Sequence, residues 1–252
     1  MPLYHTAAVV LRRRNFGEAD RIITFFTHDF GKIKCIAKGS RRFKSKLSGN
    51  LEPFTFLRII YFGKENQNIY QINSCDIIRS FHKVGEDYKR LSICSYIVEL
   101  IDTMFKENDP NRELLGLLLS IFSLIEESSD VDTVLRIFEV RLLSLLGYKP
   151  ALDVCVRCNR PVDRVIRFNL IKGGIICKNC FRNTRHEIEI SRGALNFIKK
   201  SLTISLPMMG RLKIPKGLEK GIREMLHSSL SIRIGKKLKS YELLISNHSR
   251  NS

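Results

Sequence analysis

The residues best suited to chemistry are four cysteines arranged in two pairs. Cys155 and Cys158 enclose two residues, as do Cys177 and Cys180, and eighteen residues separate the pairs. Two such pairs at this separation are typical of a zinc site, because each pair places two thiolates on one side of a tetrahedral ion. Four protein ligands leave no open position for water or substrate. The spacing therefore predicts a closed, structural zinc site rather than a catalytic one.

Other assignments of these cysteines stay open at this point. They could be unrelated thiols or redox dithiols, although a redox motif is usually a single pair near a βαβ pattern, and four thiolates also suit iron. Gly173 and Gly174 precede the second pair and indicate a tight turn that folds the chain back. The remaining cysteines, Cys35, Cys75 and Cys94, lie in apolar surroundings and are expected to be buried thiols.

Composition bounds the class of protein. A chain of 252 residues that is 44% hydrophobic and 27% charged is typical of a globular protein with more than one domain. It has no apolar run of about eighteen residues, so we expect no membrane span. The first residues lack a basic segment followed by an apolar one, so we expect no secretory signal. The cysteine pattern suits a reducing cytoplasm.

The net charge of +18 is unevenly distributed along the chain. It is +8 in residues 1–80, −4 in 81–150, +4 in 151–190 and +10 in 191–252. Segregated positive charge favours a polyanionic partner, most simply nucleic acid. A generally basic surface without such a partner is the alternative that composition leaves open.

Residues 5–80 are predicted to form β structure. Five short runs rich in β-branched and apolar residues are bounded by turn residues, with no long helical pattern between them. Five strands in so short a segment predict a small barrel, an OB-fold with an SH3-like barrel as the nearest alternative. The expected strands are His5–Leu11, Arg21–Thr27, Lys32–Lys38, Thr55–Phe62 and Asn68–Ile78.

The most basic stretch of the chain begins in the third of these strands. Seven basic residues and no acid lie between Lys32 and Lys46, and Gly39 and Ser40 indicate a loop there. Because no acid is interleaved, we predict contact with nucleic-acid phosphates. Phe43 could stack on an unpaired base or plug the barrel end, and the plug is slightly favoured. The predicted DNA-binding residues are Lys32, Lys34, Lys38, Arg41, Arg42, Lys44 and Lys46, and Arg12, Arg13 and Arg14 could extend their surface.

After the predicted barrel, the pattern becomes helical. Apolar residues recur at helical spacing in residues 88–105, 114–125 and 130–145, with Asn108, Asp109 and Pro110 as a break. Short connections predict a bundle of three helices. Its acidic balance favours a protein-docking surface over a DNA surface, and plain scaffold is an equal alternative.

Further helices are predicted after the cysteine segment. Ser191 is a candidate N-cap, and Pro215 is a candidate first helical residue before an apolar stripe. The last helix is expected over Ile232–Leu244, with a basic face that meets either nucleic acid or water. We therefore predict an α+β multidomain chain, with a zinc module inserted in a helical domain. The predicted domains are an OB-fold in 1–80, a first helical part in 81–150, the four-cysteine zinc module in 151–186 and a C-terminal helical part in 187–252.

A search for catalytic constellations favours a non-enzymatic protein. The sequence has no GxxxxGK[ST] loop, no GxGxxG after a strand, no HExxH and no GxSxG. Its six histidines are scattered, and its carboxylates form no evident magnesium-binding cluster.

Several segments carry a recognisable family pattern. They are Thr6–Leu11, Phe16–Ile22 and Gly31–Lys32, Ala37–Arg42 with Lys44–Ser45, Leu51–Phe54, Phe138–Leu143 with Leu146–Pro150, and the four cysteines with Gly173 and Gly174. Together these segments resemble the RecO family of bacterial recombination mediators in DNA repair, over most of residues 1–210. Asn159 follows the second cysteine, where that family commonly has glycine.

The resemblance implies a fold and a set of partners. It implies an N-terminal OB-fold, a central helical domain and an inserted zinc module. It also implies binding to single- and double-stranded DNA and annealing of complementary strands, in a bacterial, nucleoid-associated protein. The implied protein partners are RecR and the acidic C-terminal tail of the single-stranded DNA-binding protein, so that the recombinase RecA can be loaded in the RecF pathway.

Three hypotheses about function follow. The first is a non-catalytic DNA-binding mediator, whose affinity for single strands falls steeply with salt. The second is a nucleic-acid-modifying enzyme in which zinc is only structural, and the third is a DNA-binding regulator that discriminates between duplex sequences. The mediator is the hypothesis that the charge pattern and the resemblance jointly favour.

Overall fold

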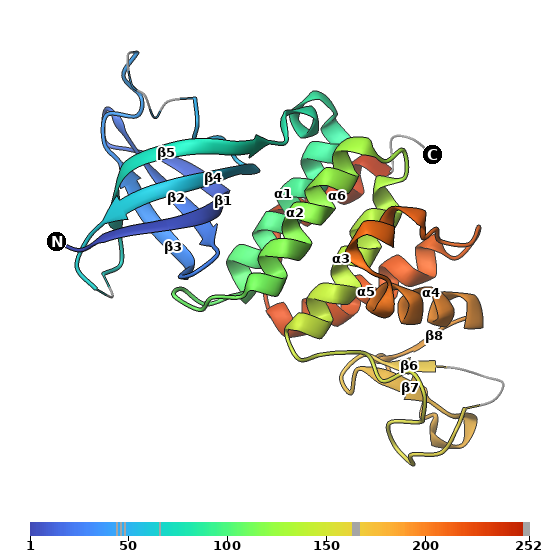
Figure 1. The fold of residues 1–252 in the computed structure, drawn as a ribbon. Helices are drawn as coiled ribbons and strands as arrows, with labels where there is room; N and C mark the ends of the chain where they lie inside the picture. The colour runs from blue at the N-terminus through green and yellow to red at the C-terminus, as the bar shows by residue number, and fades with distance from the viewer. Residues whose placement is uncertain (44, 46, 48, 66, 163–166, 249–252) are drawn as a thin grey trace. The chain divides into compact units, whose positions relative to one another are not determined.

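The computed structural model describes residues 1–43, 45, 47, 49–65, 67–162 and 167–248. The chain divides into two compact units. The first consists of Met1–Glu126 with Leu238–Ser252, and the second of Glu127–Lys237 (Figure 1). We retain the finer division at 80/81, 150/151 and 186/187 as a proposal about modules within the chain.

The first unit begins with a closed five-stranded barrel. Its strand order is β1-β2-β3-β5-β4, with β1 also paired to β4. The β3–β5 pairing is parallel and the other pairings are antiparallel. This is the OB-fold arrangement, so the OB-fold prediction is confirmed over the SH3-like alternative. The strands are β1 (Leu3–Phe16), β2 (Asp20–Thr27), β3 (Gly31–Ala37), β4 (Thr55–Phe62) and β5 (Tyr70–Ser80).

Alternating side chains fill the barrel. In β4, Leu57, Ile59 and Tyr61 are buried while Arg58 between them is exposed. Such alternation places one face of each strand inside and the other in solvent. Cys35 and Cys75 belong to this interior and Cys94 to a helix core, as the sequence predicted.

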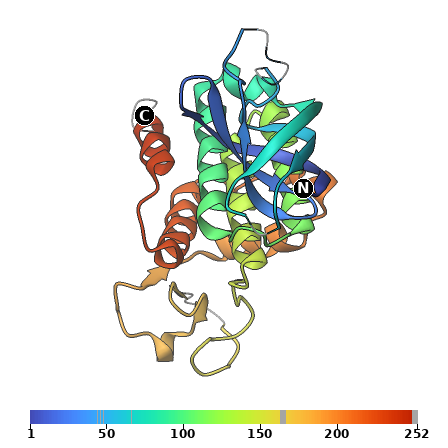
Figure 2. The ribbon, with the colours of Figure 1, turned by 90° about the vertical axis from the view of Figure 1, so that its left-hand side faces the viewer.

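Three α-helices complete the first unit: α1 (Tyr88–Met104), α2 (Arg112–Glu127) and α6 (Lys239–His248), preceded by the short η1 (His82–Glu86). Asp87 caps α1 by accepting a hydrogen bond from the Arg90 backbone N–H at 2.7 Å. The helix α6 lies against α1 (Figure 2). There the Glu99 carboxylate accepts hydrogen bonds from the first backbone N–H groups of α6.

The connection between α1 and α2 packs directly on the barrel at the β2–β3 turn. Gly31 has a φ of +65°, and a Cβ built there would lie 2.3 Å from the carbonyl oxygen of Asp109. The Asn108 N–H donates to the Lys32 carbonyl at 3.0 Å. Only glycine combines this backbone conformation with so close an approach, so Gly31 joins the barrel to its helices.

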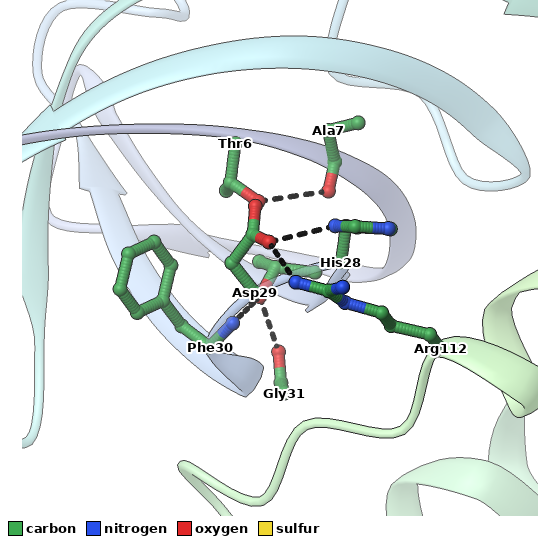
Figure 3. A network of polar contacts seen from close by, with 8 residues as sticks. Thr6, Ala7, His28, Asp29, Phe30, Gly31 and Arg112 are labelled. Atoms are coloured by element: carbon green, nitrogen blue, oxygen red, sulfur yellow. Dashed lines mark hydrogen bonds and ion pairs between the residues drawn. The ribbon is translucent and has the colours of Figure 1, made fainter.

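A carboxylate reinforces the same junction. Asp29 accepts a hydrogen bond from the Thr6 hydroxyl at 2.8 Å and lies 2.7 Å from His28 Nδ1 and 3.1 Å from Arg112 Nη2, at the start of α2 (Figure 3). Hydrogen bonds from His28 and Thr6 hold the pKa of Asp29 below its ordinary value. The network therefore favours the ionised carboxylate.

The second unit combines helices with a small sheet. The sheet has the order β7-β6-β8 and is antiparallel. The elements are α3 (Val131–Leu145), β6 (Arg167–Asn169), β7 (Gly174–Ile176), η2 (Lys178–Cys180), β8 (Glu187–Glu189), α4 (Arg192–Thr203), η3 (Leu206–Arg211) and α5 (Glu219–Ile234). Asp130 caps α3, and Ser191 caps α4 as its position predicted. No helix among the described residues is both long and apolar enough to span a bilayer.

Two helix boundaries differ from the sequence prediction. Pro215 is not the first helical residue, because α5 begins at Glu219 after a turn at Lys216 and Gly217. The helix expected over Ile232–Leu244 is interrupted: Gly235 adopts a φ of +67° and ends α5. A left-handed glycine stops a helix without steric cost, and this signal outweighed the continuing apolar and basic pattern.

We expect Gly31→Ala to destabilise the protein more than Gly17→Ala. Both glycines have positive φ, but a Cβ at Gly17 meets nothing within 4 Å. The control should lose about 1–2 kcal/mol from backbone strain, and Gly31→Ala about 1–3 kcal/mol more from the clash with Asp109. Urea unfolding of both variants measures the difference in the free energy of unfolding. Equal losses of stability would show that the Asp109 backbone moves aside without cost.

A second prediction concerns pH. Because the pKa of Asp29 is lowered on folding, its contribution is complete well above the ordinary value of 3.8 and is lost as the pH falls below it. Asp29→Asn should lower the free energy of unfolding by about 0.5–1 kcal/mol at neutral pH, since the group is partly exposed, and by less in acid. Asp76→Asn, at an exposed barrel carboxylate with no ion pair among the described residues, is the control. A loss of stability that does not change with pH would contradict a stabilising role for the ionised Asp29 carboxylate.

Candidate nucleic-acid interface and metal centre

The four predicted metal ligands meet in one place. The Sγ atoms of Cys155, Cys158, Cys177 and Cys180 all lie within 4.8 Å of one another. The Cys158 and Cys177 sulfurs are 3.7 Å apart, close to the edge of about 3.8 Å of a tetrahedron with zinc–sulfur bonds of about 2.3 Å. The donor set and the spacing therefore fit a tetrahedral thiophilic metal, and the four cysteines could hold such an ion.

Local backbone structure shapes the first cysteine turn. The Asn159 N–H donates to the Cys155 carbonyl at 2.8 Å, and Asn159 has a φ of +59°. Asparagine is among the few residues besides glycine that adopt this conformation readily. Asn159 thus closes the turn that follows the second cysteine. In the second pair, the Cys180 N–H donates to the Cys177 carbonyl at 3.0 Å.

The glycine pair brings the two cysteine turns together. Gly173 has a φ of +66° at the β6–β7 turn, which confirms the turn expected there. A Cβ on Gly174 would lie 2.3 Å from the Val156 side chain, and the Val156 N–H donates to the Ile175 carbonyl at 2.9 Å. The first cysteine turn therefore packs directly on β7, whose end leads into Cys177.

A partly buried ion pair braces the four-cysteine cluster, and sequence reasoning missed it. Arg157, between the first two cysteines, pairs with Glu187 of β8 at 2.5 Å and also donates to the Cys180 carbonyl. Although burial of Glu187 opposes its ionisation, the Arg182 backbone N–H and the Arg157 guanidinium keep its pKa below the usual value. The sequence marks Arg157 only as a basic residue, because its partner lies thirty positions away.

The thiols differ in how readily they ionise. Although burial opposes ionisation of Cys155, backbone N–H groups of Cys177, Arg157 and Cys158 lower its pKa to about 6. Hydrogen bonding to Cys158 raises the pKa of Cys180 to about 12. Metal binding would therefore release protons from this cluster, as thiolate coordination requires.

Hydrogen bonds anchor the start of the basic loop. The Gly39 N–H donates to Asp20 Oδ1 at 2.7 Å, and the Arg41 N–H donates to the Ala19 carbonyl at 2.9 Å. The Arg41 guanidinium also reaches the Gly17 carbonyl at 3.2 Å. These bonds hold the start of the loop against the β1–β2 turn. The side chains of Lys38, Arg41 and Arg42 are exposed.

Two aromatic rings stand beside these cations. Phe43 is fully exposed, so its interpretation as a plug of the barrel end was wrong. Leu51 is buried in the barrel core and Leu47 packs against it, so other residues of this loop take that place. Phe16, at the end of β1 next to the same turn, is 50% exposed and was overlooked, because exposure of a strand-end aromatic residue has no sequence signal.

Lys32 and Lys34 lie in a different environment from the rest of the predicted set. Lys32 is only 6% exposed. Its Nζ lies 3.2 Å from Asp102 Oδ1 and donates to the Asp102 carbonyl. Lys34 pairs with Glu107 in the α1–α2 connection. DNA contact by these two lysines stays a prediction, and the geometry gives both a role in joining the barrel to its helices.

The other barrel cations are mixed in character. Arg13 pairs with Glu52, whereas Arg12 and Arg14 are exposed and form no ion pair with any described residue. The structure thus brings an open group together at the β1–β2 turn: Lys38, Arg41 and Arg42, with Arg12 and Arg14 on β1. The predicted sites Lys44 and Lys46 lie outside the described residues.

The fold and these sites define an OB-fold protein with exposed cations at the β1–β2 turn and a four-cysteine cluster that could hold a metal ion. Comparison with known proteins is consistent with this class. The family model described as "Recombination protein O N terminal" matches residues 1–81. The model described as "Recombination protein O C terminal" matches residues 85–242.

Full-length relatives agree with the family models. The protein named DNA repair protein RecO of Syntrophus aciditrophicus (strain SB) is 31% identical over 245 residues, which cover 96% of this chain and 95% of the relative. The protein of the same name from Acetivibrio thermocellus is 36% identical over 200 residues, covering 78% and 79%. The chain belongs to the RecO family. Membership supports a role in DNA repair and recombination.

We expect Cys177→Ser to release the metal and destabilise the second unit. A serine hydroxyl is a poor replacement for a thiolate, and metal binding to such a cluster supplies folding energy. Elemental analysis should show about one ion per chain in the parent, as a single tetrahedral site requires, and a substoichiometric amount in the variant. Cys94→Ala, at a buried thiol in α1, should keep its metal. Unchanged metal content and melting of Cys177→Ser would refute the site.

Proposed function

We propose that this chain is a non-catalytic DNA-binding recombination mediator that binds single-stranded DNA and anneals complementary strands. The observation that carries the proposal is the open group of cations at the β1–β2 turn of an OB-fold in a RecO-family chain. Lys38, Arg41 and Arg42 are exposed, and no carboxylate pairs with them among the described residues. They are therefore available to phosphates.

The proposed DNA-binding surface combines charge with stacking. Cationic side chains on a fixed turn follow the phosphate backbone, while Phe43 and Phe16 offer faces on which unpaired bases stack, worth about 1–3 kcal/mol per base. Neutralised phosphates repel one another less, so two complementary strands held on such a surface can pair without any bond chemistry. Lys44 and Lys46, from the same loop, belong to the proposed surface.

The proposed metal is zinc, in a structural role. Four thiolates at tetrahedral spacing complete its coordination, so no position is left for a substrate. When bound, zinc would hold the two cysteine turns together, while Arg157 and Glu187 fix the surrounding loops. The function needs no metal chemistry at this centre.

We further propose the partners and location that the family resemblance implies. These are RecR, the acidic C-terminal tail of the single-stranded DNA-binding protein and, indirectly, RecA loaded in the RecF pathway of recombinational repair. The proposed location is the bacterial cytoplasm, in association with the nucleoid. No particular residue is proposed for docking of the tail peptide.

The salt dependence of binding tests the proposal. Each single-strand phosphate contact contributes about −0.7 to the slope of log K against log salt. Replacing Arg41 and Arg42 by Ala should flatten the slope by about 1.4 and weaken binding to a mixed-sequence single strand roughly 25-fold at about 0.1 M salt. All sequences should be affected about equally. Fluorescence anisotropy measures both quantities, and a strand-annealing assay should show a parallel loss.

Two comparisons sharpen this test. Lys216→Ala with Lys220→Ala removes the same charge from exposed positions of the second unit and should leave the slope unchanged. Lys34→Ala removes a predicted DNA contact that is paired with Glu107, so it should flatten the slope less than either arginine substitution. If the charge-matched control flattened the slope equally, phosphate binding by this loop would be refuted. It would also be refuted if the affinity of the parent protein for DNA did not change with salt. Metal-dependent cleavage of labelled DNA would favour a nucleic-acid-modifying enzyme instead.

A further inference from the structure

A pocket lined with aromatic rings opens at the end of the barrel where β1 begins and β4 ends. Its volume is about 310 Å³. The α1–α2 connection contributes Asn108 and Pro110 to its rim, and the barrel contributes the other lining residues. Those are Tyr4, Asp29, Phe30, Tyr61, Glu65 and Tyr70.

The four rings form a continuous aromatic wall. Tyr4 stacks on Tyr61, with centroids 5.1 Å apart and planes 20° apart. Tyr70 meets Tyr61 edge-on at 5.1 Å, and Phe30 does so at 6.0 Å. Tyr61 and Tyr70 are nearly buried in the barrel core, so the half-buried Tyr4 and Phe30 offer most of the accessible ring surface. An aromatic face attracts a cation placed over it.

The charges of the pocket have the opposite sign to those of the protein as a whole. The net charge of the chain is +18, yet both charged lining residues, Asp29 and Glu65, are acids. Asp29 is kept ionised by His28 and Thr6, and it also contacts Arg112 (Figure 3). Glu65 is exposed and forms no ion pair with any described residue. One carboxylate is therefore free to meet a positive group.

We propose that this pocket receives a cationic side chain, arginine or lysine, presented by a partner protein. Aromatic faces and a free carboxylate together select a positive group with an apolar stem. A nucleotide would place its phosphates beside the unpaired Glu65 carboxylate and is disfavoured. The basic loop lies beyond the other end of β1, next to the β1–β2 turn. The partner and DNA would therefore engage opposite ends of one barrel and need not compete.

The experiment uses the full chain labelled with 3-fluorotyrosine. The protein has seven tyrosines and no tryptophan, so fluorine NMR gives a small set of signals. Tyr4, Tyr61 and Tyr70 report on the pocket, while Tyr88 and Tyr148 lie outside its lining. The probe is the peptide acetyl-Gly-Arg-Gly-Arg-Gly-amide, and its control carries citrulline, the neutral isostere, in place of both arginines. General attraction of the cationic probe is suppressed, because the protein is itself strongly positive.

The expected result is a saturable shift of the three pocket signals with the arginine peptide. The citrulline peptide should bind at least fivefold more weakly. Glu65→Gln should weaken the arginine peptide about three- to tenfold, and this exposed substitution does not threaten folding. Glu86→Gln, in η1 and outside the pocket, should leave the affinity unchanged.

Three outcomes would overturn the proposal. Equal binding of both peptides would show an apolar pocket without selectivity for charge. A shift of the pocket signals by oligo-dT, but not by the arginine peptide, would make it a base-binding pocket. Absence of any saturable shift with the arginine peptide would show that no cation binds. None of these outcomes bears on the salt slope of DNA binding, so this proposal and the proposed function fail separately.

Discussion

The contact between Gly31 and the Asp109 backbone is the constraint on which the arrangement of the first unit depends. It allows the α1–α2 connection to lie directly on the β2–β3 turn. Around that contact, Lys32 pairs with Asp102, Lys34 with Glu107, and Arg112 with Asp29. The close approach therefore determines which cations of the barrel are neutralised by nearby acids and which stay open to solvent.

This constraint gives the two ends of the barrel different electrostatic character. At the β2–β3 turn, acids from the helical connection neutralise the nearby lysines, and the aromatic pocket lies beside them. At the β1–β2 turn, Asp20 accepts a hydrogen bond from the loop backbone, so that Lys38, Arg41 and Arg42 extend into solvent. A largely neutralised end and an open cationic end on one small domain suit the two partners that we propose, a cationic group at the first and a polyanion at the second.

Much of this fold was predictable from local patterns. Runs of β-branched and apolar residues bounded by turn residues located all five strands, and the spacing of Cys155, Cys158, Cys177 and Cys180 identified a cluster that the fold does bring together. Both are signals of short range in the sequence. Capping residues such as Ser191 located helix starts for the same reason, since a cap acts on N–H groups within three residues.

The features that escaped prediction depend on distant partners. Lys32 and Lys34 looked like members of one basic run, but their acids lie about seventy positions away. The aromatic pocket draws Tyr4, Phe30 and Tyr61 from three separate strands and turns, and no linear motif marks it. Where local signals competed, as at Gly235, the prediction gave too much weight to the periodic pattern and too little to a left-handed glycine.

The same distinction supports our proposal that the four-cysteine module has a structural role and is not the DNA-binding surface. Net charge makes residues 151–190 look like a second basic surface. Yet Arg157 is paired with Glu187 and bonded to the second cysteine turn. Arg167 lies over the Phe181 ring with 3.8 Å between the guanidinium carbon and the ring centroid. A cation held by a carboxylate or a ring inside its own module has less to offer a phosphate, because binding DNA would first require those contacts to break. The open cations of the OB-fold carry no such cost.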